Sequence, residues 1–264
     1  MGDELIHRPE HLRGVALLAH LAVEFEPKIE LLHLAAELGK RGKRVLLVDM
    51  DPQGNATSGL GIAKKSVKAS SYQVLTGETP ASEAVIATEF KNLSLIPSTI
   101  SLVGAEYDLH TTEDRGLNCA NALAPLREDY DFILIDCPPT LGMLTINALA
   151  AADGIIIPMP CDFFSLEGLS QLNITIKKVR SLYNPNLDIT GILLTMYNKR
   201  LLLTAQVEGE LKKYYADKLF RATISRSVKL AEAPGFGKPI VYFDPYGKGS
   251  LEYRDVVKEL LLRV

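Results

Sequence analysis

Short apolar runs recur along the chain, and turn residues bound each of them. Runs this short that are apolar at nearly every position indicate strands buried on both faces, as in a parallel sheet. Seven strands are predicted, over residues 44–49, 93–97, 131–136, 154–158, 189–196, 219–224 and 240–243.

Stretches with apolar residues at helical spacing lie between these runs. They predict helices over residues 28–41, 116–127, 141–152, 166–182, 203–215 and 251–262. Residues 63–89 are less regular and predict short helices at the sheet edge. Strand–helix alternation over the whole length favours a single doubly wound α/β domain, with a mostly parallel, twisted sheet of about seven or eight strands and helices on both faces. We expect residues 1–13 to form a tail before a domain of residues 14–264.

Composition narrows the class of protein. The chain has 264 residues, of which 47% are apolar and 23% charged, with a net charge of −3. Such a chain can bury a large core, which excludes a disordered or collagen-like protein. No apolar run reaches the roughly 20 residues of a membrane span. Three cysteines far apart in sequence, Cys119, Cys137 and Cys161, favour reduced thiols in a cytosolic protein over disulfides or a zinc site.

Acidic residues stand at the ends of two predicted strands. In doubly wound sheets, ligands bind outside the carboxyl ends of the strands. Asp49 and Asp51 follow one strand and Asp136 ends another, so they are expected to face one crevice. Hard oxygen ligands of this kind suit a magnesium–phosphate site. Turn or helix capping by Asp49 and Asp136 explains the same pattern, and the sequence leaves both interpretations open.

Four segments carry a more specific signal. They are VLLVDMDPQGNATSGLG (residues 45–61), DFILIDCPPTLGMLTINAL (131–149), TMYNKR (195–200) and SVKLAEAPGFGKPI (227–240). In this order they resemble the ParA/Soj family of chromosome- and plasmid-partitioning ATPases, a deviant-Walker branch of the P-loop ATPases. The resemblance runs from about Leu34 to the C-terminus.

The resemblance implies a function and several residue roles. Members of the family dimerise around two ATP molecules, bind DNA without sequence preference and respond to a ParB/Spo0J-type partner. ATP and Mg²⁺ are the implied cofactors; zinc and haem are not expected. By the same resemblance, Asp51 would orient the attacking water, Asp136 would hold Mg²⁺ through water and Asn198 would lie near the adenine. The implied location is cytoplasmic, at the nucleoid.

One segment differs from the sequence expected for the family. Members of the family carry a KGGVGKTT loop, whose amides cradle phosphates and whose lysines neutralise them. Counted back without a gap, this loop should occupy residues 22–29, which read AVEFEPKI. Pro27 stands where the phosphate lysine is expected, and Ala22 where the lysine that reaches across the dimer is expected.

The replaced loop is poorly suited to a triphosphate. It lacks the glycines that allow successive amides to face an anion, and Pro27 supplies no amide. Glu24 and Glu26 would repel phosphates at the start of the helix. Lys28 is one position out of register and would reach the site if the loop were one residue shorter. We therefore predict that ATP binding and hydrolysis are weak or absent, leave open whether the chain is an enzyme, and expect Ala22 to weaken a homodimer.

Charge is distributed unevenly. Residues 177–229 hold eleven Lys or Arg and four acids, a net +7, so the remainder carries −10. A basic region in an acidic protein favours a polyanionic partner, although solvated helix faces give the same pattern. The basic DNA-contacting residues of the family lie in this part of the chain, which makes Arg200, Arg226 and Lys229 the candidate contacts.

Other signals are weaker. The letters HRPEH at residues 7–11 match a zinc-peptidase pattern, but Pro9 disfavours the helix it needs. His20 and His33 are expected to be packed. Residues 251–264 are expected to pack as core, without the basic amphipathic tail of the similar MinD proteins, which disfavours membrane targeting. The alternative functions are a non-catalytic scaffold that binds DNA or a protein partner and, more weakly, a MinD-like positioning ATPase.

Overall fold

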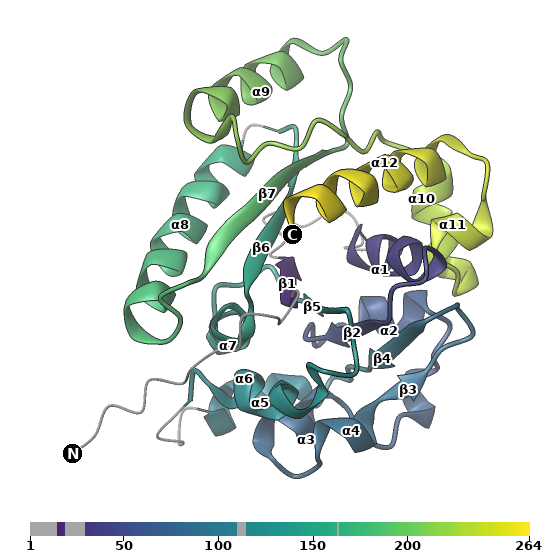
Figure 1. Cartoon of the computed structure of the whole chain (residues 1–264), viewed down its shortest axis with the longest axis vertical. Helices are drawn as coiled ribbons and strands as arrows, with labels where there is room; N and C mark the ends of the chain where they lie inside the picture. Colours follow the sequence, from purple (N-terminus) through teal and green to yellow (C-terminus); the bar gives the residue numbers. More distant parts are fainter. Residues whose placement is uncertain (1–14, 19–29, 110–114, 163) are drawn as a thin grey trace.

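A seven-stranded sheet forms the centre of the described part of the chain (Figure 1). The computed structural model describes residues 15–18, 30–109, 115–162 and 164–264. The strand order is β3-β4-β2-β5-β1-β6-β7; β3 pairs antiparallel with β4, and every other pairing is parallel. The strands are β1 (Val15–Leu18), β2 (Val45–Asp49), β3 (Ile86–Ala87), β4 (Leu93–Ile96), β5 (Phe132–Asp136), β6 (Gly154–Pro160) and β7 (Asp188–Thr195).

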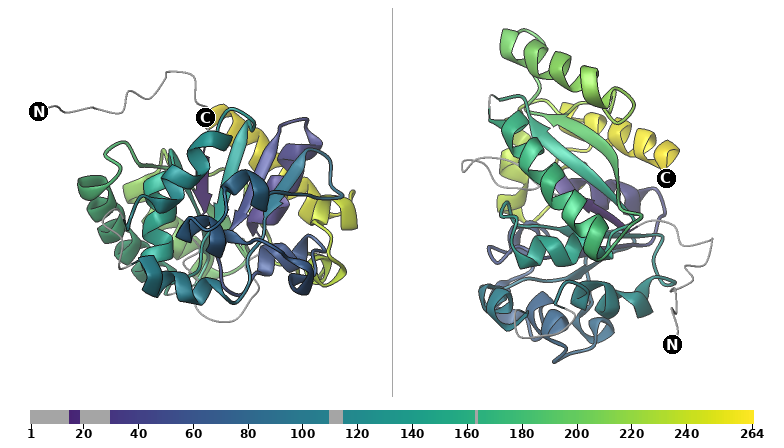
Figure 2. Two further views of the ribbon diagram at one scale, coloured as in Figure 1. Left: turned by 90° about the horizontal axis from the view of Figure 1, so that it is seen from below. Right: turned by 90° about the vertical axis from the view of Figure 1, so that its left-hand side faces the viewer.

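Helices cover both faces of this sheet (Figure 2). On β2, Leu46 and Val48 join the core under α5 to α8, whereas Val45 and Leu47 join the core under α1 and α12. The predicted fold class and strand number are thus confirmed. The helices are α1 (Glu30–Lys40), α2 (Asn55–Gly59), α3 (Ser71–Thr76), α4 (Ala81–Ala84), α5 (Leu102–Leu109), α6 (Asn118–Leu123), α7 (Met143–Ala151), α8 (Ser165–Leu182), α9 (Leu202–Tyr215), α10 (Val228–Glu232), α11 (Ile240–Phe243) and α12 (Lys248–Arg263), with 3₁₀ turns η1 (Lys64–Ser66), η2 (Ala124–Leu126) and η3 (Ala233–Phe236).

Helix α1 is buried along its length. Leu32, Ala35 and Leu38 belong to the core it shares with α12. His33 is also fully buried: its Nδ1 accepts the Ile240 N–H at 3.1 Å, and burial lowers its pKa to about 3. His33 is therefore a neutral packing residue, as predicted. The helix predicted from residue 28 is seen from Glu30, and residues 28 and 29 lie outside the described residues, as do His20 and the division at residue 14.

Two predicted strands are wrong. Residues 240–243 form α11, since an apolar tetrapeptide can be a buried helical turn as well as a strand. Residues 219–224 follow β7 with isolated bridges at Leu219 and Ser225 only. Phe220 and Ile224 still donate their N–H groups to the carbonyls of Ile192 and Leu194 in β7, both at 2.9 Å. Between them the Glu259 carboxylate accepts the N–H groups of Arg221 and Ala222, so the pairing with β7 is interrupted there. The segment therefore lies beside β7 without forming a continuous strand.

Two family-like segments meet at a glycine contact. Gly61 and Gly237 both adopt left-handed backbone, with φ of +77° and +65°. A Cβ on Gly237 would lie 2.7 Å from the Gly61 Cα, and α2 packs against η3 beside this point. Only glycine fits, because a side chain would meet backbone atoms in a conformation that already disfavours one.

In the residues that the structure describes, no helix combines the length and apolar character that a membrane span requires.

We expect Gly237→Ala to lower the free energy of unfolding by about 2 kcal/mol or more, since strain in φ adds to a backbone clash. Urea denaturation measures this loss. Two controls separate the causes. Gly77→Ala, which has φ of +77° and open space, should cost about 1 kcal/mol. Gly235→Ala, also in open space but without positive φ, should stay within about 0.5 kcal/mol. Equal losses at Gly77 and Gly237 would show that the contact contributes nothing.

Candidate functional site

The two acidic strand ends lie side by side. Strands β2 and β5 pair in a register that places Asp49 opposite Asp136, and the Met50 N–H donates to the Asp136 carbonyl at 2.8 Å. Both aspartates are buried. On the other side of β5, Leu18 at the end of β1 is also in register with Asp136. The connection from β1 to α1, where a phosphate loop would lie, therefore starts next to these carboxylates.

Asp49 organises the loop that follows its strand. Its Oδ2 accepts both the N–H and the hydroxyl of Thr57, at 2.8 and 2.7 Å, and its Oδ1 accepts the Asp51 N–H at 3.2 Å. Burial raises the pKa of Asp49 to about 6, while the Thr57 hydrogen bonds oppose that rise. The capping interpretation thus describes Asp49. It does not describe Asp136, because α7 begins after Gly142 without a side-chain cap.

Thr57 links this loop to a second strand. Its fully buried hydroxyl donates to Asp49 and accepts the Ser98 N–H at 2.9 Å, just beyond β4. The ends of β2 and β4 are thereby joined through one side chain. No pattern along the chain pointed to this role, since Thr57 and Ser98 are separated by 41 positions.

Asp51 lies in a tight turn at the same edge. Its Oδ1 accepts the Gln53 N–H at 2.9 Å and its carbonyl accepts the Gly54 N–H at 2.8 Å. Gly54 has φ of +58° and precedes α2. The Lys64 ammonium donates to the Gln53 carbonyl, so a cation that sequence analysis had not selected rests on the Asp51 loop. Asp51 is buried, and its role toward an attacking water stays a prediction.

The candidate DNA contacts gather beyond β7. Tyr197 and Ser225 form a parallel bridge, so Asn198 and Arg226 follow two neighbouring chain segments. Asn198 and Arg200 share a turn in which the Asn198 Oδ1 accepts the Arg200 N–H at 3.1 Å. All three side chains are exposed; Lys229, on α10, is exposed too and pairs with Glu232 at 3.0 Å.

Many of the other basic residues in this part of the chain are paired locally. Lys212 pairs with Glu208 at 2.5 Å and Lys213 with Glu210 at 2.5 Å. Lys218 and Arg180 share Asp188, at 2.8 and 2.6 Å. Solvated helix faces therefore explain part of the net +7. Arg200 and Arg226 remain candidate contacts for a polyanion because both are exposed and lie in neighbouring loops.

Several predicted residues lie outside the described residues. They include Lys28, Ala22 and the rest of the replaced loop, and the HRPEH letters at residues 7–11. Among the residues described, no three His, Cys, Asp or Glu side chains gather as direct metal ligands. Asp136 still fits Mg²⁺, because this ion keeps several waters and takes one or two carboxylates together with substrate phosphates.

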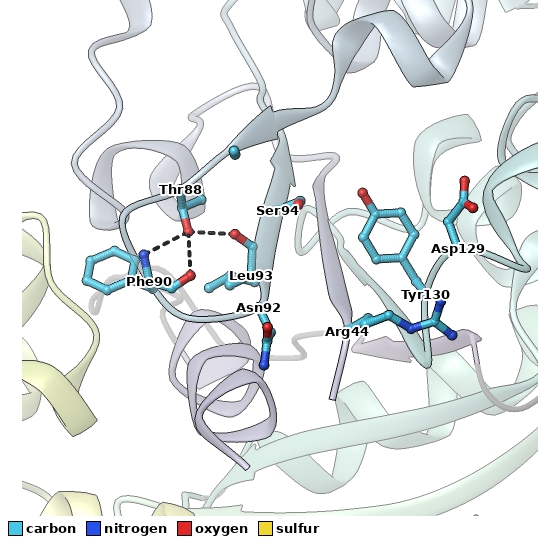
Figure 3. Close-up of a pocket in the computed structure, with 9 residues that line it drawn as sticks. Arg44, Thr88, Phe90, Asn92, Leu93, Ser94, Asp129 and Tyr130 are labelled. Atoms are coloured by element: carbon cyan, nitrogen blue, oxygen red, sulfur yellow. Dashed lines mark hydrogen bonds between the residues drawn. The ribbon is translucent and has the colours of Figure 1, made fainter. Parts of the chain in front are cut away.

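A hollow of about 430 Å³ lies at the opposite edge of the sheet (Figure 3). Arg44, Leu93 and Tyr130 line it, next to the amino ends of β2, β4 and β5. Thr88 closes one side with hydrogen bonds to Phe90 and Leu93. Arg44 is bound to Asp131 at 3.0 Å, which lowers the pKa of that carboxyl. This hollow is therefore separate from the acidic strand ends.

Comparison with known proteins places the chain in a family. Residues 30–189 match a family model described as an AAA domain. The chain is 48% identical over 228 residues to the sporulation initiation inhibitor protein Soj of Bacillus subtilis, covering 86% of this chain and 90% of that one. It is 45% identical over 232 residues to the chromosome partitioning protein ParA of Myxococcus xanthus, covering 88% and 82%. The chain belongs to the ParA/Soj family.

Solved structures share the fold of this ParA/Soj family member. A cobyrinic acid a,c-diamide synthase from Mycobacterium smegmatis, with bound ATP analogue and magnesium, has a TM-score of 0.83 at 32% identity over 94% of each chain. A putative plasmid partition protein from Borrelia burgdorferi bound to AMPPNP has a TM-score of 0.78 at 27% identity, over 95% of this chain and 98% of that one. The family match begins at residue 30, directly after the replaced loop.

We expect Thr57→Val to lower the free energy of unfolding by about 2 to 4 kcal/mol, because the buried Ser98 N–H loses its acceptor and Asp49 Oδ2 keeps only the N–H of residue 57 as a donor. The loss should be larger at pH 7.5 than at pH 5. Below a pKa of about 6 Asp49 is protonated and needs the hydroxyl less, whereas above it the buried carboxylate loses a donor. Urea denaturation without nucleotide or divalent cation, at both pH values, measures this.

Thr57→Ser is the matched control, since it keeps the hydroxyl and removes one methyl group. It should cost about 1 kcal/mol with no difference between the two pH values. A pH-independent loss in Thr57→Val would show that the hydroxyl does not support the Asp49 carboxylate.

Proposed function

We propose that this chain is a partition protein of the ParA/Soj type, which associates with DNA without sequence preference and has lost most of its nucleotide binding. One observation carries the proposal. The chain resembles partitioning proteins over 86–88% of its length, yet residues 22–29 hold none of the glycines of a phosphate loop.

Electrostatics support the loss of nucleotide binding. Asp49, Asp51 and Asp136 are three carboxylates at one edge of the sheet, and a triphosphate there needs cations to balance both itself and them. A phosphate loop supplies such cations and a set of amides. The replacement adds Glu24 and Glu26 to the same region of the sequence and contributes one lysine, Lys28. Lys64 is a further cation near Asp51, but its ammonium already binds the Gln53 carbonyl.

If a nucleotide does bind, the residues keep the roles that the resemblance implies. Asp136 would hold Mg²⁺ through water, Asp51 would orient the attacking water, and Asn198 would lie near the adenine. Bound Mg²⁺ would supply charge neutralisation at the phosphates. Lys28 would then be the principal loop cation.

DNA association rests on exposed arginines. Arg200 and Arg226 lie in neighbouring loops at the carboxyl end of β7, with Lys229 on the helix that follows. Bulk phosphate contacts by such side chains carry no sequence information. Ala22 removes the lysine that would reach across a dimer, so two basic faces should rarely meet on one duplex.

The remaining inferences follow from the family. A ParB/Spo0J-type protein is the expected partner, and the nucleoid in the cytoplasm the expected location. The altered loop favours the non-catalytic scaffold as the second candidate, which would bind DNA or its partner without a nucleotide switch. The similarity to the MinD of Pyrococcus furiosus, at 23% identity and a TM-score of 0.77, concerns the fold alone.

We expect ATP with Mg²⁺ to bind with a Kd well above the micromolar range, or not at all, because the loop amides and lysines are missing. Isothermal titration calorimetry on the full chain measures this. If heat is detected, Lys28→Ala should abolish it, whereas Lys213→Ala, a surface lysine paired with Glu210, should not. Binding at micromolar Kd would contradict our interpretation of residues 22–29, whether or not it survives Lys28→Ala.

We expect weak, salt-sensitive binding to duplex DNA that Arg200→Ala and Arg226→Ala each reduce equally for unrelated sequences. Each lost phosphate contact should lower the slope of log K against log salt by about one. Fluorescence anisotropy over a salt series measures the affinity and the salt slope. The titration is repeated with ATP, which should change neither. Lys212→Ala, whose cation is paired with Glu208, is the control and should leave the slope unchanged.

Strong stimulation of DNA binding by ATP would mean that the nucleotide switch is intact. Absence of binding at low salt would leave the basic region as ordinary solvated surface.

A further inference from the structure

An aromatic pair with a cation stands on the surface next to the candidate DNA contacts. Phe236, at the end of η3, stacks on Phe243 of α11, with ring centroids 5.1 Å apart and planes at 30°. The Lys229 ammonium lies 5.4 Å from the centre of the Phe243 ring. Phe236 is 67% exposed although it is large and apolar, so one face of its ring is covered by Phe243 and much of the rest is open to solvent.

Packing of η3 against α2 holds the aromatic pair in place. Pro234 precedes it in η3, which packs against α2, and Gly237 directly after it is fixed against Gly61. A rigid aromatic ring loses little conformational entropy when it binds a flat partner. An exposed ring that is both buttressed and pre-positioned is suited to stacking.

Cations flank the pair in the sequence. Residues 226–248 contain Arg226, Lys229, Lys238 and Lys248, against the acids Glu232 and Asp244. Lys229 pairs with Glu232 at 3.0 Å and Lys248 with Glu252 at 3.5 Å, and both lysines are exposed, so these surface pairs can exchange for a phosphate. A flat apolar face beside cationic side chains matches a nucleotide unit, in which a base is joined to a phosphodiester.

We propose that Phe236 is a stacking platform for an unpaired base of single-stranded nucleic acid, whose backbone follows Arg226 and Lys229. The inference rests on the proposed association with DNA and adds a second substrate form to that basic surface. An unpaired strand offers the open faces of its bases, whereas the bases of a duplex must first be unstacked at a cost in free energy. The single strand is therefore the favoured occupant, and a purely apolar partner would not explain the cations.

The test uses three probes that share length and phosphate charge per strand. They are a fluorescein-labelled oligothymidylate of about 20 nucleotides, an abasic oligomer of the same length and a duplex of the same length. Fluorescence anisotropy at low salt with the full chain should give tighter binding to oligothymidylate than to the abasic strand. Phe236→Ala should weaken oligothymidylate binding about tenfold, equal to about 1.4 kcal/mol, and leave abasic binding unchanged.

Two further variants keep the test falsifiable. Phe236→Trp keeps a ring and should retain the preference for bases. Tyr214→Ala removes a similarly exposed aromatic from α9, which lies apart from α10 and α11 (Figure 1), and should change nothing. Circular dichroism of each variant checks the fold. The spectrum should be unchanged in Phe236→Ala, because Phe236 is exposed and its loss leaves no core cavity.

Two outcomes would overturn the inference, and they are distinguishable. Equal affinity for oligothymidylate and the abasic strand, or an equal loss on both in Phe236→Ala, would remove the stacking role and leave the proposed DNA association intact. Failure to bind any of the three probes would remove both.

Discussion

The register of β2 against β5 is the constraint on which the candidate site depends. Parallel pairing over Val45 to Asp49 places Asp49 opposite Asp136 on neighbouring strands. Two buried acids at adjacent strand ends are unfavourable unless donors or cations compensate them. In this chain Thr57 and the Asp51 N–H supply donors to Asp49, and the loop that carries Asp51 owes its shape to these bonds.

The position of the acidic strand ends also explains why residues 22–29 are expected to affect nucleotide binding. β1 lies between β5 and β6, so the segment that follows Leu18 begins beside Asp136. In a phosphate loop, amides and lysines arriving at this point would balance both the strand-end acids and a bound phosphate. At the positions where the resemblance would place such a loop, residues 22–29 contain two glutamates, one lysine and a proline. The strand-end acids are present, and weak nucleotide binding stays a prediction.

Long-range packing brings the family motifs together in a way that also shapes the surface. The contact of Gly61 with Gly237 fixes the segment that starts at Ser227 against the end of the β2–α2 region. That segment carries Arg226 at its entry, Lys229 on α10 and the exposed ring of Phe236. The close approach of these two backbones therefore positions the segment that carries Lys229 and Phe236 against α2.

The sequence by itself determined the sheet interior and the acidic edge. Strands β2, β5 and β6 were predicted because a strand buried on both faces is apolar at every position, and parallel strands deliver their carboxyl ends to one edge. The multi-residue motifs identified the ParA/Soj family.

Tertiary structure alone decided that residues 240–243 are a helix, that Glu259 binds the N–H groups of residues 221 and 222, and that Lys64 donates to the Asp51 loop. It also decided which cations are paired and that Phe236 stacks on Phe243. The physical reason is common to all of these: a pattern along the chain reports whether a residue is buried, but the partner that satisfies its hydrogen bonds or charge comes from a distant segment.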